Sequence, residues 1–277
     1  MDVKEVFISS LGSGSGGNAF IIEYGAEALI VDQGFSRKEL LTRMEAIGFD
    51  PQRLCGALLT HEHTDHSKGS RVFCDALGVT LYTTSGTALY LRNKNQLPRQ
   101  VRAFEPGASF EIGSFTVQSF ALPHDAVDPV GFTLYCGDCK IGIATDLGRT
   151  DANILKQLTG CDALIIESNY DKTMLMNSDR RLELKRRICG VRGHLGNTDT
   201  CDLLPKVLCE RCKVLFLAHI SSECNRSDIV EECCMESLRQ IPCSSELYVE
   251  ILSQHAPSRR VSLTPPVITE AIQEDLF

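Results

Sequence analysis

The stretch THEHTDH, residues 60–66, limits what this chain can fold into more than any other part of the sequence. It follows the apolar run GALL and contains three of the seven histidines. A strand that ends in a turn here would direct His61 and His63 to one point and Asp65 and His66 to a neighbouring point. Imidazole and carboxylate groups together suit zinc, manganese or iron. The spacing therefore predicts a metal site at the end of a buried strand.

Three more residues offer ligand atoms directly after apolar runs. His124 follows SFTVQSFALP, Asp146 follows KIGIAT and His219 follows VLFLA. One histidine after a strand more often has a structural role, but three such residues beside a dense cluster favour a shared metal site. We therefore expect them to gather along one edge of the sheets, as a two-metal centre requires.

The order of apolar runs predicts the fold class. Strands with glycine-rich turns fill the first half, and helices alternate with strands in the second. This order predicts an α+β fold of two β-sheets packed face to face, with helices on the outer faces. The predicted helices are SRKELLTRMEAIGFD, with Ser36 as its N-cap, DANILKQLTG, RLELKRRIC, TCDLLPKVLCERC, interrupted at Pro205, and SDIVEECCMESLRQI. The pattern fades after the last strand, which predicts a catalytic domain at 1–254 and a tail at 255–277.

Composition and apolar patterning indicate the cellular location of the protein and limit its partners. No run approaches the roughly 20 apolar residues that span a membrane, and the N-terminus lacks a signal-peptide pattern, so we expect a cytoplasmic protein without a membrane partner. The 13 cysteines form no disulfide framework. Cys136/Cys139 and Cys209/Cys212 could make a zinc site, although buried or cross-strand positions are favoured. The net charge of −8 argues weakly against a nucleic acid partner, but net charge says little about whether a local basic patch exists.

The motif H-x-H-x-D-H, followed by separate His, Asp and His residues, resembles the metallo-β-lactamase superfamily over nearly the whole chain. The resemblance implies a four-layer αββα sandwich of two mixed sheets with a dinuclear centre. The implied ligands are His61, His63 and His124 for one metal, Asp65, His66 and His219 for the other, and Asp146 as the bridge. The Asp-His pair at 65–66 favours a hydrolase over the flavo-diiron branch.

The implied centre has a direct chemistry. Two divalent ions about 3.5–4 Å apart share a water, lower its pKa and stabilise both the attacking and the leaving oxygen. We expect Zn²⁺ or Mn²⁺, with Fe as a further choice, and a metal-bridging hydroxide as the nucleophile. Asp65 is expected to orient that hydroxide by accepting a hydrogen bond.

The stretch RGHLGN, residues 192–197, points to phosphodiester substrates. In the phosphodiesterase branches of the superfamily, a histidine in this region contacts the scissile phosphate or protonates the leaving oxygen, which implies a catalytic role for His194. A helix-capping or core histidine is the alternative. Arg192 and Asn197 flank it as expected substrate contacts. Asn18, after the glycines of GSGSGGN, would donate to phosphate or close its own loop.

A basic stretch precedes that motif. Five of the eight residues in RRLELKRR, 180–187, are basic. On a helix, Arg181, Lys185 and Arg192 would lie near one face and could follow phosphates, whereas a solvated helix face is the alternative. A second, weaker patch comprises Arg92, Lys94, Arg99 and Arg102.

Several stretches resemble the YycJ/WalJ branch of the superfamily, among them VDQG (31–34), PHDAVDPVGF (123–132), LIIESNYD (164–171) and LAHISSECN (217–225). Members of that branch are regarded as 5′-to-3′ exonucleases on double-stranded DNA that are linked to repair, so the resemblance implies an exonuclease acting on duplex ends. One departure is Gly196, where the branch usually has serine. The alternatives are a small-molecule phosphodiesterase for cyclic or nucleotide substrates and a non-catalytic, clamp-associated accessory protein.

The last five residues, QEDLF, resemble the peptide that binds the bacterial sliding clamp, commonly written Q-L-[SD]-L-F. The matching residues are Gln273, Asp275, Leu276 and Phe277. In such a peptide two apolar side chains enter a groove while the glutamine fixes the register. The alternative is a helix packed on its own domain, since Ile268, Ile272 and Leu276 have helical spacing.

Overall fold

A computed structural model describes residues 4–241 and 246–263. These residues form two seven-stranded sheets, in the orders β14-β1-β2-β3-β4-β5-β6 and β13-β12-β11-β10-β9-β8-β7. Both sheets are mixed, because each joins antiparallel hairpins to parallel pairs. The first sheet comprises β1 (Val6–Gly12), β2 (Ala19–Tyr24), β3 (Glu27–Val31), β4 (Leu54–Leu58), β5 (Leu81–Thr84), β6 (Val101–Phe104) and β14 (Val261–Ser262). The second comprises β7 (Ser109–Ile112), β8 (Phe115–Ala121), β9 (Val130–Cys136), β10 (Cys139–Ala144), β11 (Ala163–Glu167), β12 (Val214–Ala218) and β13 (Tyr248–Ile251).

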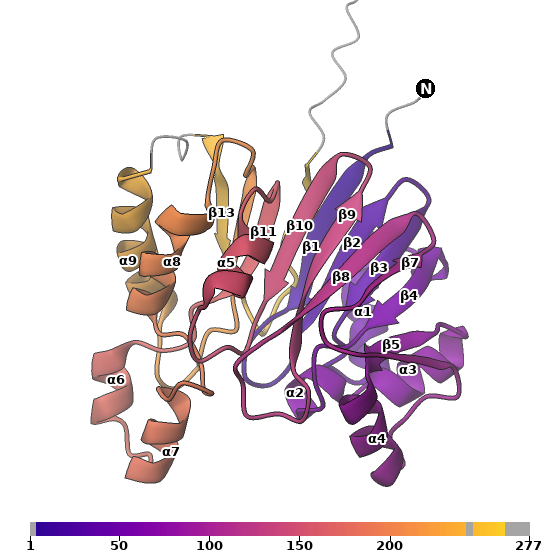
Figure 1. The fold of residues 1–277 in the computed structure, drawn as a ribbon, viewed down its shortest axis with the longest axis horizontal. Coiled ribbons are helices and arrows are strands. Elements are labelled where there is room, and N and C mark those ends of the chain that lie inside the picture. Colours follow the sequence, from indigo (N-terminus) through magenta and orange to yellow (C-terminus); the bar gives the residue numbers. More distant parts are fainter. Residues whose placement is uncertain (1–3, 242–245, 264–277) are drawn as a thin grey trace, which may run out of the picture.

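Helices cover the outer faces of both sheets (Figure 1). The first sheet carries α1 (Arg37–Ala46), α2 (Thr64–Ser67), α3 (Ser70–Leu77) and α4 (Ser85–Asn93), with a short 3₁₀ turn at Pro51–Arg53. The second carries α5 (Ala152–Leu158), α6 (Lys172–Asn177), α7 (Leu182–Ile188), α8 (Asn197–Val207) and α9 (Ser227–Arg239). In Figure 1, α2 lies at one end of the sandwich, with α7 on one side of it and α3 and α4 on the other.

Three layers of buried side chains hold this sandwich together. Phe20 and Ile22 of β2 face the second sheet, whereas Ile21 between them faces α1 and α3. On β11, Ile165 faces the first sheet, whereas Leu164 and Ile166 face α5, α8 and α9. This alternation follows from the two-residue period of a strand, and it explains why strands buried on both faces read as continuous apolar runs.

The predicted α+β sandwich is confirmed, with corrections at the level of single elements. Ser36 caps α1 by accepting from the Glu39 amide, as predicted. The predicted helix TCDLLPKVLCERC begins three residues earlier, at Asn197, continues through Pro205 and ends at Val207. The sequence patterns missed α2, α3, α4, α6, β6 and β14.

The cysteine pairs do not form the zinc site considered from the sequence. Cys136 and Cys139 are paired across the turn between β9 and β10, the predicted cross-strand position. In the described part of the chain, no group of three metal-ligating side chains includes a cysteine. Within that same part, no helix is long and apolar enough to cross a membrane.

The described part of the predicted tail begins on the first sheet. The Ser258 hydroxyl accepts a hydrogen bond of 2.8 Å from the Ser10 amide, and β14 pairs with β1 in antiparallel register. The division at residue 254 stays a prediction, and the clamp motif, residues 273–277, lies outside the described residues.

Candidate metal centre

The predicted metal ligands lie just after strands of both sheets. The segment with His61 and His63 follows β4, while Asp146 and His219 follow β10 and β12. Their ligand atoms fall into groups in which all atoms lie within 4.8 Å of one another. These groups are His61, His63 and His124; Asp65, His66 and His219; His61, His66 and Asp146; and Asp146, Glu167, His194 and His219. The structure thus brings together both expected ligand sets and gives Asp146 neighbours in each.

The ring nitrogens of these histidines are arranged as a cation would need them. Nε2 of His61 is buried and has no hydrogen-bond partner among the described residues. Nε2 of His124 faces Nδ1 of His63 at 3.2 Å. Burying a nitrogen lone pair without a partner costs free energy, and a divalent ion would use those lone pairs. The donor set therefore fits a divalent cation, and the histidine and aspartate cluster indicates divalent metal binding.

The backbone at the centre adopts a conformation that side chains rarely tolerate. Asp32, Asp146 and His219 have φ angles of 60°, 62° and 54°. Non-glycine residues in this left-handed region are uncommon, and they concentrate at functional sites where the surrounding structure enforces them. Each of the three follows the end of a strand, so the turn directs its side chain toward the centre.

Asp32 fixes the position of His66. Its Oδ2 lies 2.7 Å from Nδ1 of His66, and its Oδ1 accepts from the amide of Thr60 at 2.9 Å. Both side chains of the Asp32–His66 pair are fully buried. A carboxylate behind a metal-ligating histidine sets its tautomer and ring orientation.

The carboxylate of Glu167 lies behind two histidine rings, those of His194 and His219. It is fully buried at the end of β11. Its Oε1 accepts from the amides of Leu147 and Leu195, while its Oε2 lies 3.2 Å from Nδ1 of His194 and 3.3 Å from Nδ1 of His219. One carboxylate therefore orients both rings.

Buried carboxylates raise the pKa values of two histidines in the centre. Burial opposes charge on His66, but the carboxylates of Asp146, Asp32 and Asp65 raise the pKa of His66 well above its usual value. Burial also opposes charge on His219, yet Asp146 and hydrogen bonds to Asp65 and Glu167 raise the pKa of His219 to about 10. Metal ions binding to such rings displace protons, so loading the centre releases them.

His61 has the opposite electrostatic setting. Burial is the largest cause that lowers the pKa of His61 well below its usual value, and the positive charge of His66 adds to it. A histidine held neutral keeps a lone pair available, which is the form that binds a metal.

A cavity of about 220 Å³ opens onto the centre. Its lining comprises Ser15, His63, Asp65, His124, Asp125, Asp146, Arg180, Leu184, Arg187, Ile188, Gly193, His194 and His219. His194 therefore lies where the sequence placed it, beside the ligands. The expectation that Arg181, Lys185 and Arg192 share one helix is wrong, because α7 ends at Ile188. The cations that line the cavity are Arg180 and Arg187.

The three expected substrate contacts have other partners. Arg192 donates from Nε to the carbonyl of His124 at 3.0 Å. Asn18 is buried, donates to the carbonyl of Gly14 and accepts from the Ser13 hydroxyl, which closes its own loop. Asn197 is buried and bonds Ser168 and Asn225. None of the three lines the cavity.

Gly196 packs against Tyr170, with which it forms an isolated β-bridge. The amide of Asn197 donates to the Tyr170 carbonyl, and a Cβ at position 196 would lie 2.9 Å from the Tyr170 ring. The amide of Gly196 donates to Asp199, which caps the start of α8 in place of a side chain at 196. The glycine therefore makes room for the ring.

The positions of Asp32 behind His66 and of Glu167 behind both His194 and His219 do not follow from the sequence patterns. The available signal was the same for both, an acidic residue directly after an apolar strand. That signal also fits a solvated loop, so only the packing of the two sheets reveals the partners.

Comparison with known proteins identifies the family. Residues 28–220 match the beta-lactamase superfamily domain, and the chain belongs to that family. Exodeoxyribonuclease WalJ of Streptococcus pneumoniae serotype 2 is 31% identical over 236 residues, which cover 84% of this chain and 88% of the relative. Exodeoxyribonuclease YycJ of Bacillus anthracis is 30% identical over 223 residues, which cover 80% and 84%.

Solved structures confirm the fold. The metallo-beta-lactamase fold protein YhfI of Bacillus subtilis superposes with a TM-score of 0.68 at 17% identity, covering 94% of this chain and 99% of the other. The short form of human tRNase Z gives a TM-score of 0.63 at 17% identity, covering 91% and 98%. At these identities the likeness concerns the fold alone.

Asp32→Asn tests the support of His66. Asparagine tolerates the left-handed backbone but cannot supply a negative charge to the ring. We expect affinity for Zn²⁺ to fall about 10- to 100-fold, the usual effect of removing such a partner. Isothermal titration of metal-free protein measures it, with Asp202→Asn on the exposed face of α8 as the control. Equal affinities for Asp32→Asn and wild type would contradict the role of Asp32.

Proposed function

We propose that this chain is a metal-dependent exodeoxyribonuclease with a dinuclear centre, which degrades double-stranded DNA from its ends, 5′ to 3′, in replication-linked repair. One observation carries the proposal. Residues of both ligand sets, His194 and two arginines, Arg180 and Arg187, line one cavity. Such a cavity offers metal ligands, a proton donor and cations for a phosphate.

The relatives support the substrate class. Two of them, at 31% and 30% identity, are named exodeoxyribonucleases. The predicted enzyme class, a hydrolase of phosphodiester bonds, is borne out by the family and these relatives. Duplex ends, 5′-to-3′ polarity and a repair role rest on the resemblance to the YycJ/WalJ branch. Because the proposed substrate is DNA, we propose that the protein acts in the cytoplasm.

The proposed ligands are His61, His63 and His124 for one divalent ion, Asp65, His66 and His219 for the other, and Asp146 for both. When bound, the ions lower the pKa of water and stabilise negative charge on phosphate oxygens. Zn²⁺ and Mn²⁺ both suit this set. The Asp65 side chain is 24% exposed and lines the cavity, so its carboxylate can accept a hydrogen bond from the attacking water.

His194 is the proposed general acid. Its Nδ1 faces Glu167, which leaves Nε2 to carry a proton toward the cavity. The Glu167 carboxylate holds the ring in place, and an N–H at Nε2 is the group that can donate to a leaving alkoxide. Glu167 is therefore a positioning residue, and His194 is the group that meets the substrate.

Arg180 and Arg187 are proposed to bind the phosphates. Nη2 of Arg180 lies 3.1 Å from Oε2 of the exposed Glu223. Nε of Arg180 is buried without a hydrogen-bond partner among the described residues. Arg187 pairs with Asp125 and is exposed. Ion pairs of this kind are weak in water, so each guanidinium can exchange its carboxylate for a phosphate, which it binds with two parallel hydrogen bonds.

We also propose that the tail binds a bacterial sliding clamp through Gln273, Asp275, Leu276 and Phe277. The sequence resemblance supports this, and the residues lie outside the described ranges. A tether of this kind raises the local concentration of the enzyme at DNA without requiring a basic surface overall.

The first experiment uses purified protein, Mn²⁺ or Zn²⁺ and end-labelled duplex DNA. We expect nucleotides to be released from one end, chelation to stop the release, and added metal to restore it. Asp65→Ala should lose about 100-fold or more in rate, while Asp202→Ala should match the wild type. Cleavage of bis-p-nitrophenyl phosphate without cleavage of any nucleic acid would overturn the proposal in favour of a small-molecule phosphodiesterase. Clamp binding without hydrolysis in any metal would instead favour the accessory protein.

The role of His194 predicts a dependence on the leaving group. A nitrophenolate leaves without a proton, whereas a DNA alkoxide needs one. His194→Ala should therefore slow DNA cleavage by roughly 10²- to 10⁴-fold but slow bis-p-nitrophenyl phosphate cleavage far less. Rates on both substrates, measured on the same preparation, give the ratio. An equal loss on both would show that His194 does not act as the acid.

The tail proposal predicts direct binding to a purified clamp. Leu276→Ala with Phe277→Ala should remove at least about 2 kcal/mol of binding free energy, since such anchors dominate small interfaces. Ile268→Ala with Ile272→Ala is the matched control and should leave clamp binding unchanged. If the control lowers the melting temperature and neither variant affects the clamp, the tail packs on its own domain.

A further inference from the structure

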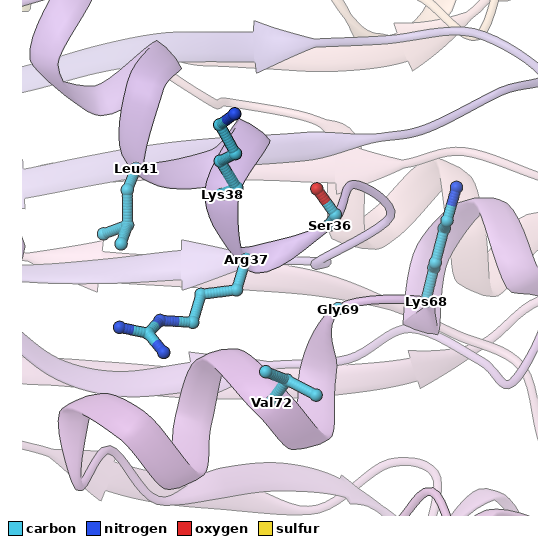
Figure 2. A pocket seen from close by; sticks show the side chains of 7 residues that line it. All are labelled: Ser36, Arg37, Lys38, Leu41, Lys68, Gly69 and Val72. Carbon is cyan, nitrogen blue, oxygen red and sulfur yellow. The ribbon is translucent and has the colours of Figure 1, made fainter.

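A second group of cations lies beside the metal centre, on the first-sheet side. Figure 2 shows a pocket of about 560 Å³ with α1 on one side and the start of α3 on the other. Arg37, Lys38 and Lys68 line it over Leu41 and Val72. In this view Lys38 and Lys68 extend in the same direction on either side of Ser36.

These three cations are available to a partner. Arg37, Lys38 and Lys68 are all exposed. The nearest acidic residue along α1, Glu39, is already paired with Arg43 at 2.6 Å. In the part of the chain that the structure describes, no carboxylate forms an ion pair with any of the three cations.

The positive surface continues along α3. Val72 also lines a second pocket, of about 380 Å³, together with Arg71, Asp75 and Arg99. We call the cations of the two pockets the α1–α3 strip: Arg37, Lys38, Lys68, Arg71 and Arg99. One carboxylate, Asp75, lines these pockets beside them. In a chain of net charge −8, such a local excess of positive charge marks a site for an anionic partner.

The strip is joined rigidly to the metal ligands. Lys68 comes two residues after His66, a separation of at most about 7 Å along the chain. The amide of Gly69 donates to the carbonyl of Gln33, and the amide of Gln33 donates to the carbonyl of His66, both at 2.7 Å. A Cβ on Gly69 would meet the Phe35 carbonyl at 2.1 Å, so these segments are in close contact. The strip and the centre therefore keep a fixed relative position.

We propose that the α1–α3 strip binds the phosphate backbone of the duplex whose end occupies the metal centre; this rests on the proposed function. Arg187 belongs to α7 and Arg71 to α3, and Figure 1 places α2 between these two helices. Duplex DNA carries one charge per roughly 1.7 Å of axis, and successive phosphates suit a row of cations. The strip therefore holds the duplex while Arg180 and Arg187 hold its end.

The test measures binding of a fluorescent duplex with cleavage-resistant phosphorothioate linkages to the metal-loaded protein, over a range of salt concentrations. The variant combines Arg37→Ala, Lys38→Ala and Lys68→Ala, all at exposed positions where alanine is tolerated. Each lost phosphate contact should reduce the slope of log K against log salt by about 0.9. We therefore expect a slope smaller by roughly 2 to 3 and a weaker affinity at every salt concentration.

The matched control removes three exposed cations from the outer helices of the second sheet, Lys156→Ala, Lys206→Ala and Arg239→Ala. It changes the net charge equally and should keep nearly the wild-type slope. Turnover of bis-p-nitrophenyl phosphate should be unchanged in both variants, because neither alters the centre. Equal slopes for the strip variant and the control would overturn the proposal for the strip alone. A wild type that cleaves the chromogenic diester but binds no duplex would overturn the DNA function itself.

Discussion

The packing of one β-sheet against the other is the interaction on which the rest of the molecule depends. Phe20 and Ile22 from one sheet and Ile165 and Phe216 from the other bury their side chains in a shared layer. That layer fixes where the strands end relative to one another. Because the ligand segments follow β4 on one sheet and β10 and β12 on the other, no metal centre exists until the layer forms.

Each sheet adds one buried carboxylate behind the ligands. Asp32 at the end of β3 holds His66, and Glu167 at the end of β11 holds His194 and His219. The arrangement is unequal, because Glu167 serves a metal-ligand candidate and the proposed acid together. A change at Glu167 would disturb His219 and the proposed acid His194 at once, whereas a change at Asp32 would act through His66.

The sequence predicts the sandwich and the ligand residues because both depend on local patterns. Doubly buried strands read as apolar runs, and several of the predicted ligands directly follow such a run, as His124 and Asp146 do. The helices α2 and α6 were missed because their four and six residues hold too little periodicity to detect. The partners of Asn18 and Asn197, and the cations that reach the cavity, depend on contacts between distant segments. No spacing along the chain encodes them.

The contact between Gly196 and Tyr170 also constrains how this protein can change. Since the ring occupies the space that a side chain at 196 would need, a substitution of Gly196 would require a smaller residue or a shifted ring at 170. The effects of substitutions at 196 and 170 on stability should therefore not add. A smaller residue at 170 would make room for a side chain at 196, but it would leave a gap beside Leu175 and Cys224, which pack with the ring.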